Sequence, residues 1–155
     1  MVDGTRVWFV TGAGRGIGRA VASAALKAGD RVVGTARKPE VLDDVRAEHG
    51  DRLHVLALDV DHRADVFAAV DQAVATFARI DVVVNNAGYG LMGAAEEVSE
   101  SAARAQMETN FFGALWVTQA ALPHLRRQGS GHVVQVSSLG GIGTFPTLGM
   151  YNASK

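Results

Sequence analysis

The chain contains no cysteine, which excludes disulfide bonds, thiolate nucleophiles and cysteine-based zinc sites. Proline is also scarce, with 3 residues against 18 glycines. No stretch reaches the roughly 20 apolar residues of a membrane-spanning helix, and the apolar run in "MVDGTRVWFV" is too short for a signal peptide. From these absences we expect a cytoplasmic protein without a membrane partner.

An excess of charge of either sign is missing as well. The formal net charge is −1, so the charge balance does not favour nucleic acid or an anionic membrane as a partner. The 5 histidines lack the spacing of metal ligands, and we interpret them as surface or core residues. A chain of 155 residues that is 48% hydrophobic predicts one globular domain, spanning residues 1–155.

Short apolar runs alternate with helical patterns along the chain. Such runs are typical of strands buried on both faces, and helices between them require right-handed parallel crossovers. The pattern predicts an α/β fold: a Rossmann-like, doubly wound parallel sheet in a single domain. Strands are expected at 6–10, 31–36, 52–60, 81–88 and 131–138, and helices at 18–29, from Pro39, at 66–77 with Asp61 as its N-cap, and at about 99–127.

The glycine-rich turn "TGAGRGIG" (11–18) directly follows the first predicted strand. Gly12, Gly16 and Gly18 permit a sharp turn and a close approach of backbone N–H groups to phosphate oxygens. The N-terminus of the next helix would then face a pyrophosphate. Neither a P-loop nor the G-x-G-x-x-G spacing is present, with Ile17 between the last two glycines. The turn therefore predicts a variant nucleotide site, and a tight turn without a ligand is the alternative.

The end of the second strand bears on the choice of nucleotide. An NAD site would have a carboxylate there for the adenosine ribose, but the sequence places Ala36, followed by Arg37 and Lys38. The Arg37 guanidinium could pair with the 2′-phosphate of NADP, and Arg15 in the glycine turn could add a second cation. The sequence therefore favours NADP(H) over NAD(H); ordinary solvated charges are the alternative.

Several polar residues are expected near the carboxyl ends of the fourth and fifth strands, where open parallel sheets bind ligands. Each alone has an ordinary interpretation as a turn, a cap or a surface amide. Together they predict a site for carbonyl reduction. The residues are Asn86, Ala87 and Gly88 in "NNAG", Asn110, Ser137, Ser138, Tyr151 and Lys155.

These motifs resemble those of the short-chain dehydrogenase/reductase family: "TGAGRGIG", "NNAG", Asn110, the serine pair at 137–138, and "YNASK". The resemblance covers the whole chain and implies hydride transfer between a nicotinamide cofactor and a carbonyl or alcohol. It implies that Tyr151 is the general acid/base and that Lys155 favours the ionised tyrosine and holds the nicotinamide ribose. It further implies that Ser138, rather than Ser137, binds the substrate oxygen and that Asn110 positions a water in a proton relay.

The resemblance also implies how the cofactor is held. The three glycines match the family's cofactor turn, Asp59 matches an acid that contacts the adenine with Val60 beside it, and Asn86 matches the "NNAG" asparagine. With the two arginines, the predicted cofactor-binding set is Gly12, Arg15, Gly16, Ile17, Gly18, Arg37, Asp59, Val60, Asn86, Ala87, Gly88, Tyr151 and Lys155.

Elementary electrostatics supports the pairing of Tyr151 with Lys155. A cation about 4 Å from a phenol, at an effective dielectric constant of about 20, favours the phenolate by roughly 4 kcal/mol. The i, i+4 spacing would place both side chains on one face of a helix.

The predicted substrate is a lipophilic alcohol or ketone, because the segments near the site are apolar. They include "YGLMGAA" and the residues Leu139, Ile142, Phe145, Leu148 and Met150. Family members continue past the lysine, so we expect a chain truncated after the fifth strand, either part of a longer protein or an inactive fragment. A nucleotide-sensing regulator and an epimerase or dehydratase of related fold are the other classes. A homodimer or homotetramer is expected by analogy with the family alone.

Overall fold

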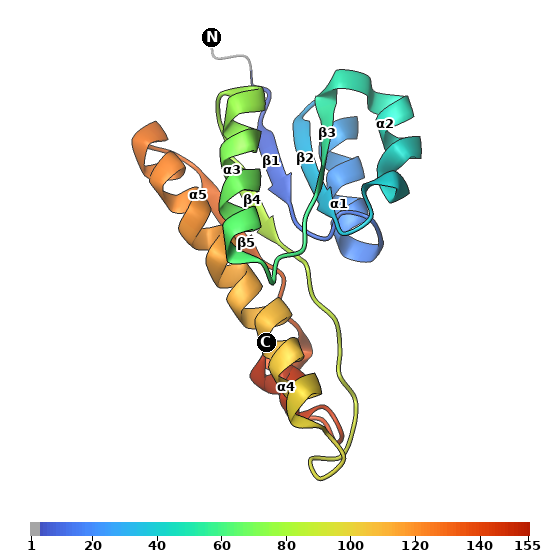
Figure 1. Cartoon of the computed structure of the whole chain (residues 1–155). Coiled ribbons are helices and arrows are strands. Elements are labelled where there is room, and N and C mark those ends of the chain that lie inside the picture. The colour runs from blue at the N-terminus through green and yellow to red at the C-terminus, as the bar shows by residue number, and fades with distance from the viewer. Residues whose placement is uncertain (1–3) are drawn as a thin grey trace.

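The computed structural model describes residues 4–155, so the first three residues of the predicted domain lie outside the described residues. Five strands form one parallel sheet in the order β3-β2-β1-β4-β5 (Figure 1). The predicted Rossmann-like, doubly wound sheet is therefore confirmed. The strands are β1 (Val7–Val10), β2 (Arg31–Ala36), β3 (Leu53–Ala57), β4 (Val82–Asn85) and β5 (His132–Gln135).

Helices connect all consecutive strands, as the alternation of patterns predicts. The connecting helices are α1 (Gly16–Lys27), the 3₁₀ helix η1 (Pro39–Leu42), α2 (Asp43–His49), the 3₁₀ helix η2 (Gly50–Arg52), α3 (Arg63–Phe77), α4 (Glu100–Met107), the π-helical turn η3 (Glu108–Gly113) and α5 (Ala114–Gln128). The 3₁₀ helix η4 (Leu139–Gly141) and α6 (Gly149–Ala153) follow β5. Within the described residues, no helix is long and apolar enough to cross a membrane.

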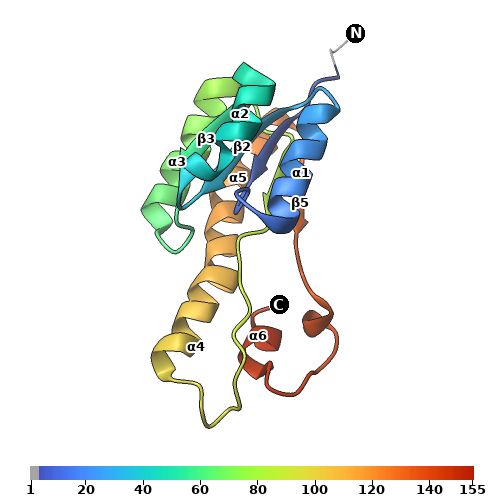
Figure 2. The same ribbon diagram turned by 90° about the vertical axis from the view of Figure 1, so that its right-hand side faces the viewer.

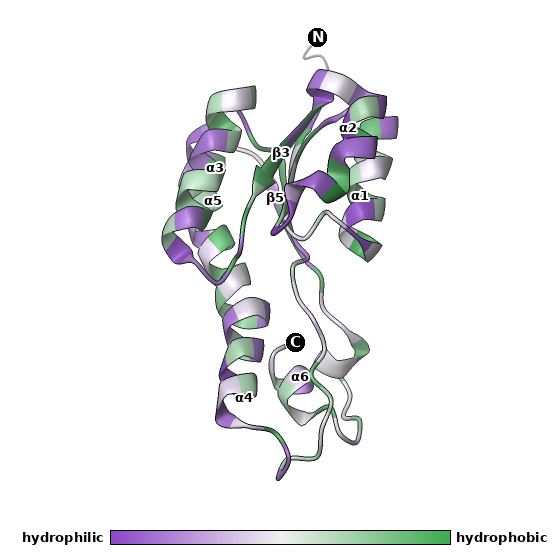
Figure 3. Cartoon of the chain, turned by 45° about the vertical axis from the view of Figure 1, so that its right-hand side comes forward, coloured by the Kyte–Doolittle hydropathy of each residue, from purple (hydrophilic) through white to green (hydrophobic). Residues whose placement is uncertain are grey.

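Two apolar layers hold the sheet between the helices. Phe9 and Val83 point to one face and pack with α3 and α5, whereas Val10 and Val84 point to the other face and pack with α1 and α2. This follows from the alternation of side chains along a strand. Figure 3 shows hydrophilic and hydrophobic residues interspersed along these helices, as expected for helices with one buried face.

The edge strand β5 departs from the expected burial. Strands β1, β2 and β4 are largely buried, but β5 is mostly exposed, and 43% of Val134 is accessible to solvent. Within the described residues only β4 pairs with β5. The prediction that the strands are buried on both faces is therefore wrong for β5, because among the described residues only Val133 of this strand packs against a core cluster.

The start of α3 also differs from the prediction. Asp61 was expected to be the N-cap, but His62 occupies that position and makes no side-chain capping bond. The backbone N–H of Asp61 donates instead to Asp59 Oδ1, at 3.2 Å, which forms an Asx turn before the helix. At α1, the helix begins at Gly16, earlier than the expected 18, with Arg15 as its N-cap.

Below the carboxyl ends of the strands, two long segments run beside the lower part of the continuous helix α4–η3–α5. Figure 2 shows the segment between β4 and α4 next to this helix, and the segment after β5, which carries α6, beyond it. The strands end at Ala57, Asn85 and Gln135, earlier than expected. The residues beyond these points leave the sheet and are free to form the walls of a site.

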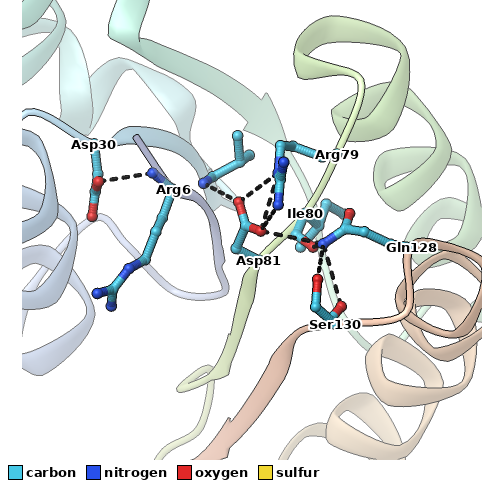
Figure 4. A network of polar contacts seen from close by, with 8 residues as sticks. Arg6, Asp30, Arg79, Ile80, Asp81, Gln128 and Ser130 are labelled. Atoms are coloured by element: carbon cyan, nitrogen blue, oxygen red, sulfur yellow. Dashed lines mark hydrogen bonds and ion pairs between the residues drawn. The ribbon is translucent and has the colours of Figure 1, made fainter. Parts of the chain in front are cut away.

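At the opposite end of the sheet, Asp81 joins three elements (Figure 4). Its carboxylate accepts the backbone N–H of Val7 at 2.8 Å and the Nε–H of Arg79 at 2.9 Å. It also accepts a hydrogen bond of 3.2 Å from Gln128 at the end of α5. This network fixes the amino ends of β1 and β4, far along the strands from the predicted site.

Candidate active site

A cleft of about 1180 Å³ lies at the carboxyl ends of the strands. Because β2 and β4 flank β1 on opposite sides, the cleft lies at the point where the strand order reverses, the usual ligand site of such sheets. Twelve of the predicted catalytic and cofactor-binding residues line it: Gly12, Arg15, Gly16, Ile17, Arg37, Asp59, Val60, Asn86, Ala87, Gly88, Tyr151 and Lys155. Gly18, Asn110 and Ser138 do not.

The glycine turn has the geometry that its sequence predicts. Gly12 and Gly16 have φ angles of +64° and +55°, in the left-handed region that favours glycine. Gly18 is needed for another reason, because a Cβ there would lie 2.5 Å from the Gly12 carbonyl oxygen and would overlap the Asn86 amide. The absence of side chains thus brings α1 against the strand and leaves the turn open to the cleft.

The turn is held by residues that follow β4. The Asn86 amide donates to the carbonyl oxygens of Thr11, at 2.9 Å, and Gly12, at 3.2 Å. In return, Thr11 Oγ1 accepts the backbone N–H groups of Asn86 and Ala87, both at 3.0 Å. Thr11 opens the motif "TGAGRGIG", but no role was predicted for its side chain. Its buried hydroxyl links the glycine turn to the segment that follows β4.

Three cations surround the end of the cleft next to β2. Arg15, Arg37 and Lys38 are exposed, and within the described residues none forms an ion pair with a carboxylate. The residue that ends β2 is Ala36, so no carboxylate stands at that position. This end of the cleft therefore offers unpaired positive charge to an anion.

The segment after Lys38, which forms η1 and the start of α2, is bound to α1 through Arg19. Arg19 donates to the Val41 carbonyl at 2.8 Å and forms an ion pair with Asp44. Val41 also covers the glycine turn, because a Cβ at Gly14 would lie 2.5 Å from its Cγ2. These contacts fix the start of η1 and α2 next to the cations.

Asn110 lies within the π-helical turn η3 and is 6% exposed. Its Oδ1 accepts the Tyr89 N–H at 3.0 Å, and its Nδ2 donates to the Tyr89 carbonyl and to Ser154 Oγ, both at 2.9 Å. π-Helical turns inside α-helices frequently mark functional sites. Here the side chain of Asn110 connects the two segments that descend from β4 and β5.

Tyr151 and Lys155 both line the cleft. The helix that was predicted to carry both, α6, ends at Ala153 and carries Tyr151 alone. The Lys155 N–H donates to the Asn152 carbonyl, three residues back, in a tighter turn than that of an α-helix. Its ammonium donates to the Val136 carbonyl at 3.2 Å. A Cβ at Gly88 would lie 3.3 Å from Lys155 Nζ, so Gly88 allows the ammonium close to the chain.

The two serines after β5 have different partners. Ser138 Oγ accepts the Gly140 N–H at 3.1 Å as the N-cap of η4. Ser137 lines the cleft, and its hydroxyl donates to the Lys155 carbonyl at 3.1 Å. The Ser138 hydroxyl can therefore still donate a hydrogen bond to another acceptor, whereas the Ser137 hydroxyl already donates to the Lys155 carbonyl.

Gln106 and Ser154, both buried, were not among the predicted site residues. Ser154 accepts from Asn110 and donates to the Tyr151 carbonyl at 2.7 Å. Gln106 precedes Asn110 by one helical turn, and two amides at this spacing beside an apolar stripe were a signal that could have been used. Within the described residues, no group of three or more acidic or histidine side chains is arranged to hold a metal ion.

Comparison with known proteins agrees with this arrangement. A family model described as short chain dehydrogenase matches residues 6–155. Oxidoreductase BOA17 of Botryotinia fuckeliana is 47% identical over 152 residues, which are 97% of this chain and 56% of that protein. The 3-ketodihydrosphingosine reductase of Bacteroides thetaiotaomicron is 37% identical over 150 residues, 97% of this chain and 53% of that protein. The chain thus spans about half the length of the curated relatives it matches.

Solved structures share the fold closely. A short-chain dehydrogenase from Streptomyces avermitilis superposes with a TM-score of 0.96 at 44% identity, over 100% of this chain and 57% of that one. An alcohol dehydrogenase from the archaeon Thermococcus sibiricus, complexed with 5-hydroxy-NADP, superposes with a TM-score of 0.91 at 30% identity. That match covers 97% of this chain and 65% of the archaeal one. The likeness to the Streptomyces protein extends from the glycine turn to Lys155.

Proposed function

Because the chain belongs to the short-chain dehydrogenase family, we propose that it transfers a hydride between NADP(H) and a lipophilic ketone or alcohol. The observation that carries the proposal is the single cleft that joins the glycine turn and the cations near β2 to Tyr151 and Lys155. A nicotinamide dinucleotide supplies the hydride when it is bound. The residues fit such a group, because the left-handed glycines leave the backbone of the turn open to a pyrophosphate.

The preference for NADP(H) is supported by the charges at the β2 end of the cleft. Arg37 and Lys38 follow Ala36, and Arg15 faces the same cleft from the glycine turn. A 2′-phosphate would form charge-assisted hydrogen bonds with such cations, and no carboxylate at the end of β2 would repel it. The NADP-type ligand bound to the archaeal relative is consistent with this preference.

The proposed chemistry uses four side chains of this chain. Tyr151 gives its phenolic proton to the carbonyl oxygen, and the Lys155 ammonium stabilises the negative charge that remains. Ser138 donates its free hydroxyl proton to the same oxygen. Asn110 fixes the segments that carry the other residues, and it positions the water of the proton relay.

A lipophilic substrate is supported by the exposed apolar side chains of the segments below the sheet. They are Tyr89, Met92, Leu139, Ile142 and Phe145. Exposed apolar side chains gathered in two neighbouring segments suit a ligand-binding surface. The exposed Phe111, with its neighbours Phe112 and Trp116, similarly supports pairing of two copies as a homodimer or homotetramer.

The test is turnover by the whole purified protein. We expect NADPH to be oxidised stoichiometrically with reduction of a lipophilic ketone, with a higher kcat/KM for NADPH than for NADH. Tyr151→Phe should lower kcat by about 10²–10⁴-fold and leave the NADPH Kd within about twofold. Binding without turnover would favour a nucleotide sensor, and conversion without net NADPH oxidation would favour an epimerase or dehydratase.

A further inference from the structure

Gln106 is a buried polar residue that has no part in the proposed chemistry. Its side chain is completely buried, with 0% of its surface accessible to solvent. Burying an amide is unfavourable unless its hydrogen bonds are satisfied. Its Oε1 accepts the Leu91 N–H at 2.8 Å, and its Nε2 donates to the Tyr89 carbonyl at 2.7 Å. A glutamine at this position therefore binds one specific stretch of backbone.

That stretch, Tyr89–Leu91, follows β4 but forms no strand of its own. Three of its backbone groups, the Tyr89 N–H and carbonyl and the Leu91 N–H, are bound by side chains instead. The Tyr89 carbonyl accepts from both Gln106 and Asn110, and the Tyr89 N–H donates to Asn110. The two amides on the α4–η3 helix thus take the place of a neighbouring strand.

The position of the stretch gives this contact a function. Tyr89 and Gly90 line the cleft together with Tyr151 and Lys155. A Cβ at Gly90 would lie 3.9 Å from Cδ2 of Tyr151, so the stretch runs beside the ring of the proposed acid/base. It forms a wall of the cleft at the end where the substrate of the proposed reaction would bind.

The residues just before this stretch have a separate anchor. Asn86 and Ala87 are held by the Thr11 hydroxyl through their backbone N–H groups. The segment after β4 therefore has two parts, one fixed to the glycine turn and one fixed to α4. The first part belongs to the cofactor side of the cleft and the second to the substrate side.

We infer that Gln106 is a positioning residue that fixes Tyr89–Leu91 as the substrate wall of the cleft. It acts through the backbone of this stretch and does not itself touch the substrate. The inference rests on the proposed function. It requires that loss of the Gln106 amide changes substrate binding while cofactor binding stays the same.

The test is Gln106→Met in the whole protein, which preserves the length of the side chain and removes both hydrogen bonds. We expect the ketone KM to rise about 10-fold, because small displacements of a positioning group have large kinetic effects. The NADPH Kd should stay within about twofold of the wild-type value. Gln106→Glu keeps the acceptor for Leu91 but loses the donor to Tyr89 when ionised, so it should also raise KM. It replaces the methionine variant in the test if that variant does not fold.

Gln128→Met is the matched control. Gln128 also donates from Nε2 to a backbone carbonyl, that of Ile80 at 3.1 Å, but at the opposite end of β4. We expect it to lower the free energy of unfolding without raising the ketone KM. An unchanged KM in Gln106→Met, or a parallel rise of KM and of the NADPH Kd, would overturn the inference. Absence of turnover in the wild type would instead refute the proposed function on which it rests.

Discussion

The side-chain amide of Asn86 lies directly against the backbone of Gly18, with no room for a methyl group between them. The same amide donates to the carbonyl oxygens of Thr11 and Gly12. One asparagine after β4 thus sets both the shape of the glycine turn and the distance of α1 from it. The glycine at position 18 is required by packing and not by its backbone angles.

Gly18→Ala should therefore destabilise the protein and weaken cofactor binding. The new Cβ would overlap the Asn86 amide and approach the Gly12 carbonyl oxygen, and overpacking of this kind costs about 1–3 kcal/mol. Urea unfolding would measure the loss, and fluorescence titration the NADPH Kd. Gly149→Ala is the matched control, because nothing lies within 4 Å of a Cβ there. Wild-type stability in Gly18→Ala would contradict the packing argument.

Replacing Arg37 should change the choice of cofactor more than the stability. Arg37→Ala removes a cation from the β2 end of the cleft, and we expect the NADPH Kd to rise about 10-fold while the NADH Kd changes little. Titrations with both cofactors at one ionic strength measure the ratio of the NADPH Kd to the NADH Kd. Arg46→Ala removes an exposed cation of α2 that does not line the cleft, and it should leave the ratio as in the wild type. Equal changes for both cofactors would argue against a 2′-phosphate site.

The serine pair after β5 gives a sharp comparison. Ser138 accepts a hydrogen bond through its oxygen and its O–H remains able to donate, whereas the Ser137 O–H donates to the Lys155 backbone carbonyl. Ser138→Ala should lower kcat by about 10²-fold, as expected for loss of a donor to the developing oxyanion. Ser137→Ala should lower it by less than about 10-fold, because that hydroxyl makes a structural bond. Steady-state kinetics with a saturating ketone would measure both, and the reverse order would assign the role to Ser137.

The parallel sheet was predictable because its signals are local. Apolar runs, the glycine turn and the helical stripes each lie within a few residues, and the crossover rule then fixes the topology. The exposure of β5 was not predictable from its sequence, because "HVVQ" reads like a buried strand. Its burial depends on which elements pack over its two faces.

The motif residues of the candidate site were predictable in identity but not in all their contacts. Gln106 and Ser154 were missed because a buried polar side chain is recognised by its partners, which lie on other elements. Likewise, the i, i+4 spacing placed Tyr151 and Lys155 on one helix, while α6 ends between them. The end of a short helix is set by tertiary contacts, here the hydrogen bond from the Lys155 ammonium to the Val136 carbonyl.

Asp81 links stability to pH at the end of the sheet away from the cleft (Figure 4). Partial burial by itself would raise the pKa of Asp81, but hydrogen bonds from Arg79, the Val7 N–H and Gln128, together with the Arg79 charge, lower it below its ordinary value. A carboxylate whose pKa is lower in the folded state stabilises the fold above the unfolded-state pKa. That contribution is lost as the pH falls through the folded-state pKa.

Asp81→Asn should therefore lower the free energy of unfolding by about 1–3 kcal/mol at neutral pH. We expect a modest loss because Arg79 is 41% exposed and its charge is screened by solvent. The difference between wild type and variant should shrink as the pH is lowered from about 5 to about 2, since the wild-type carboxylate then becomes protonated. Urea unfolding at a series of pH values measures it. Asp65→Asn removes an exposed carboxylate, 67% accessible, and should leave the pH dependence nearly as in the wild type. A difference for Asp81→Asn that stayed constant over this range would show that its ionisation does not stabilise the fold.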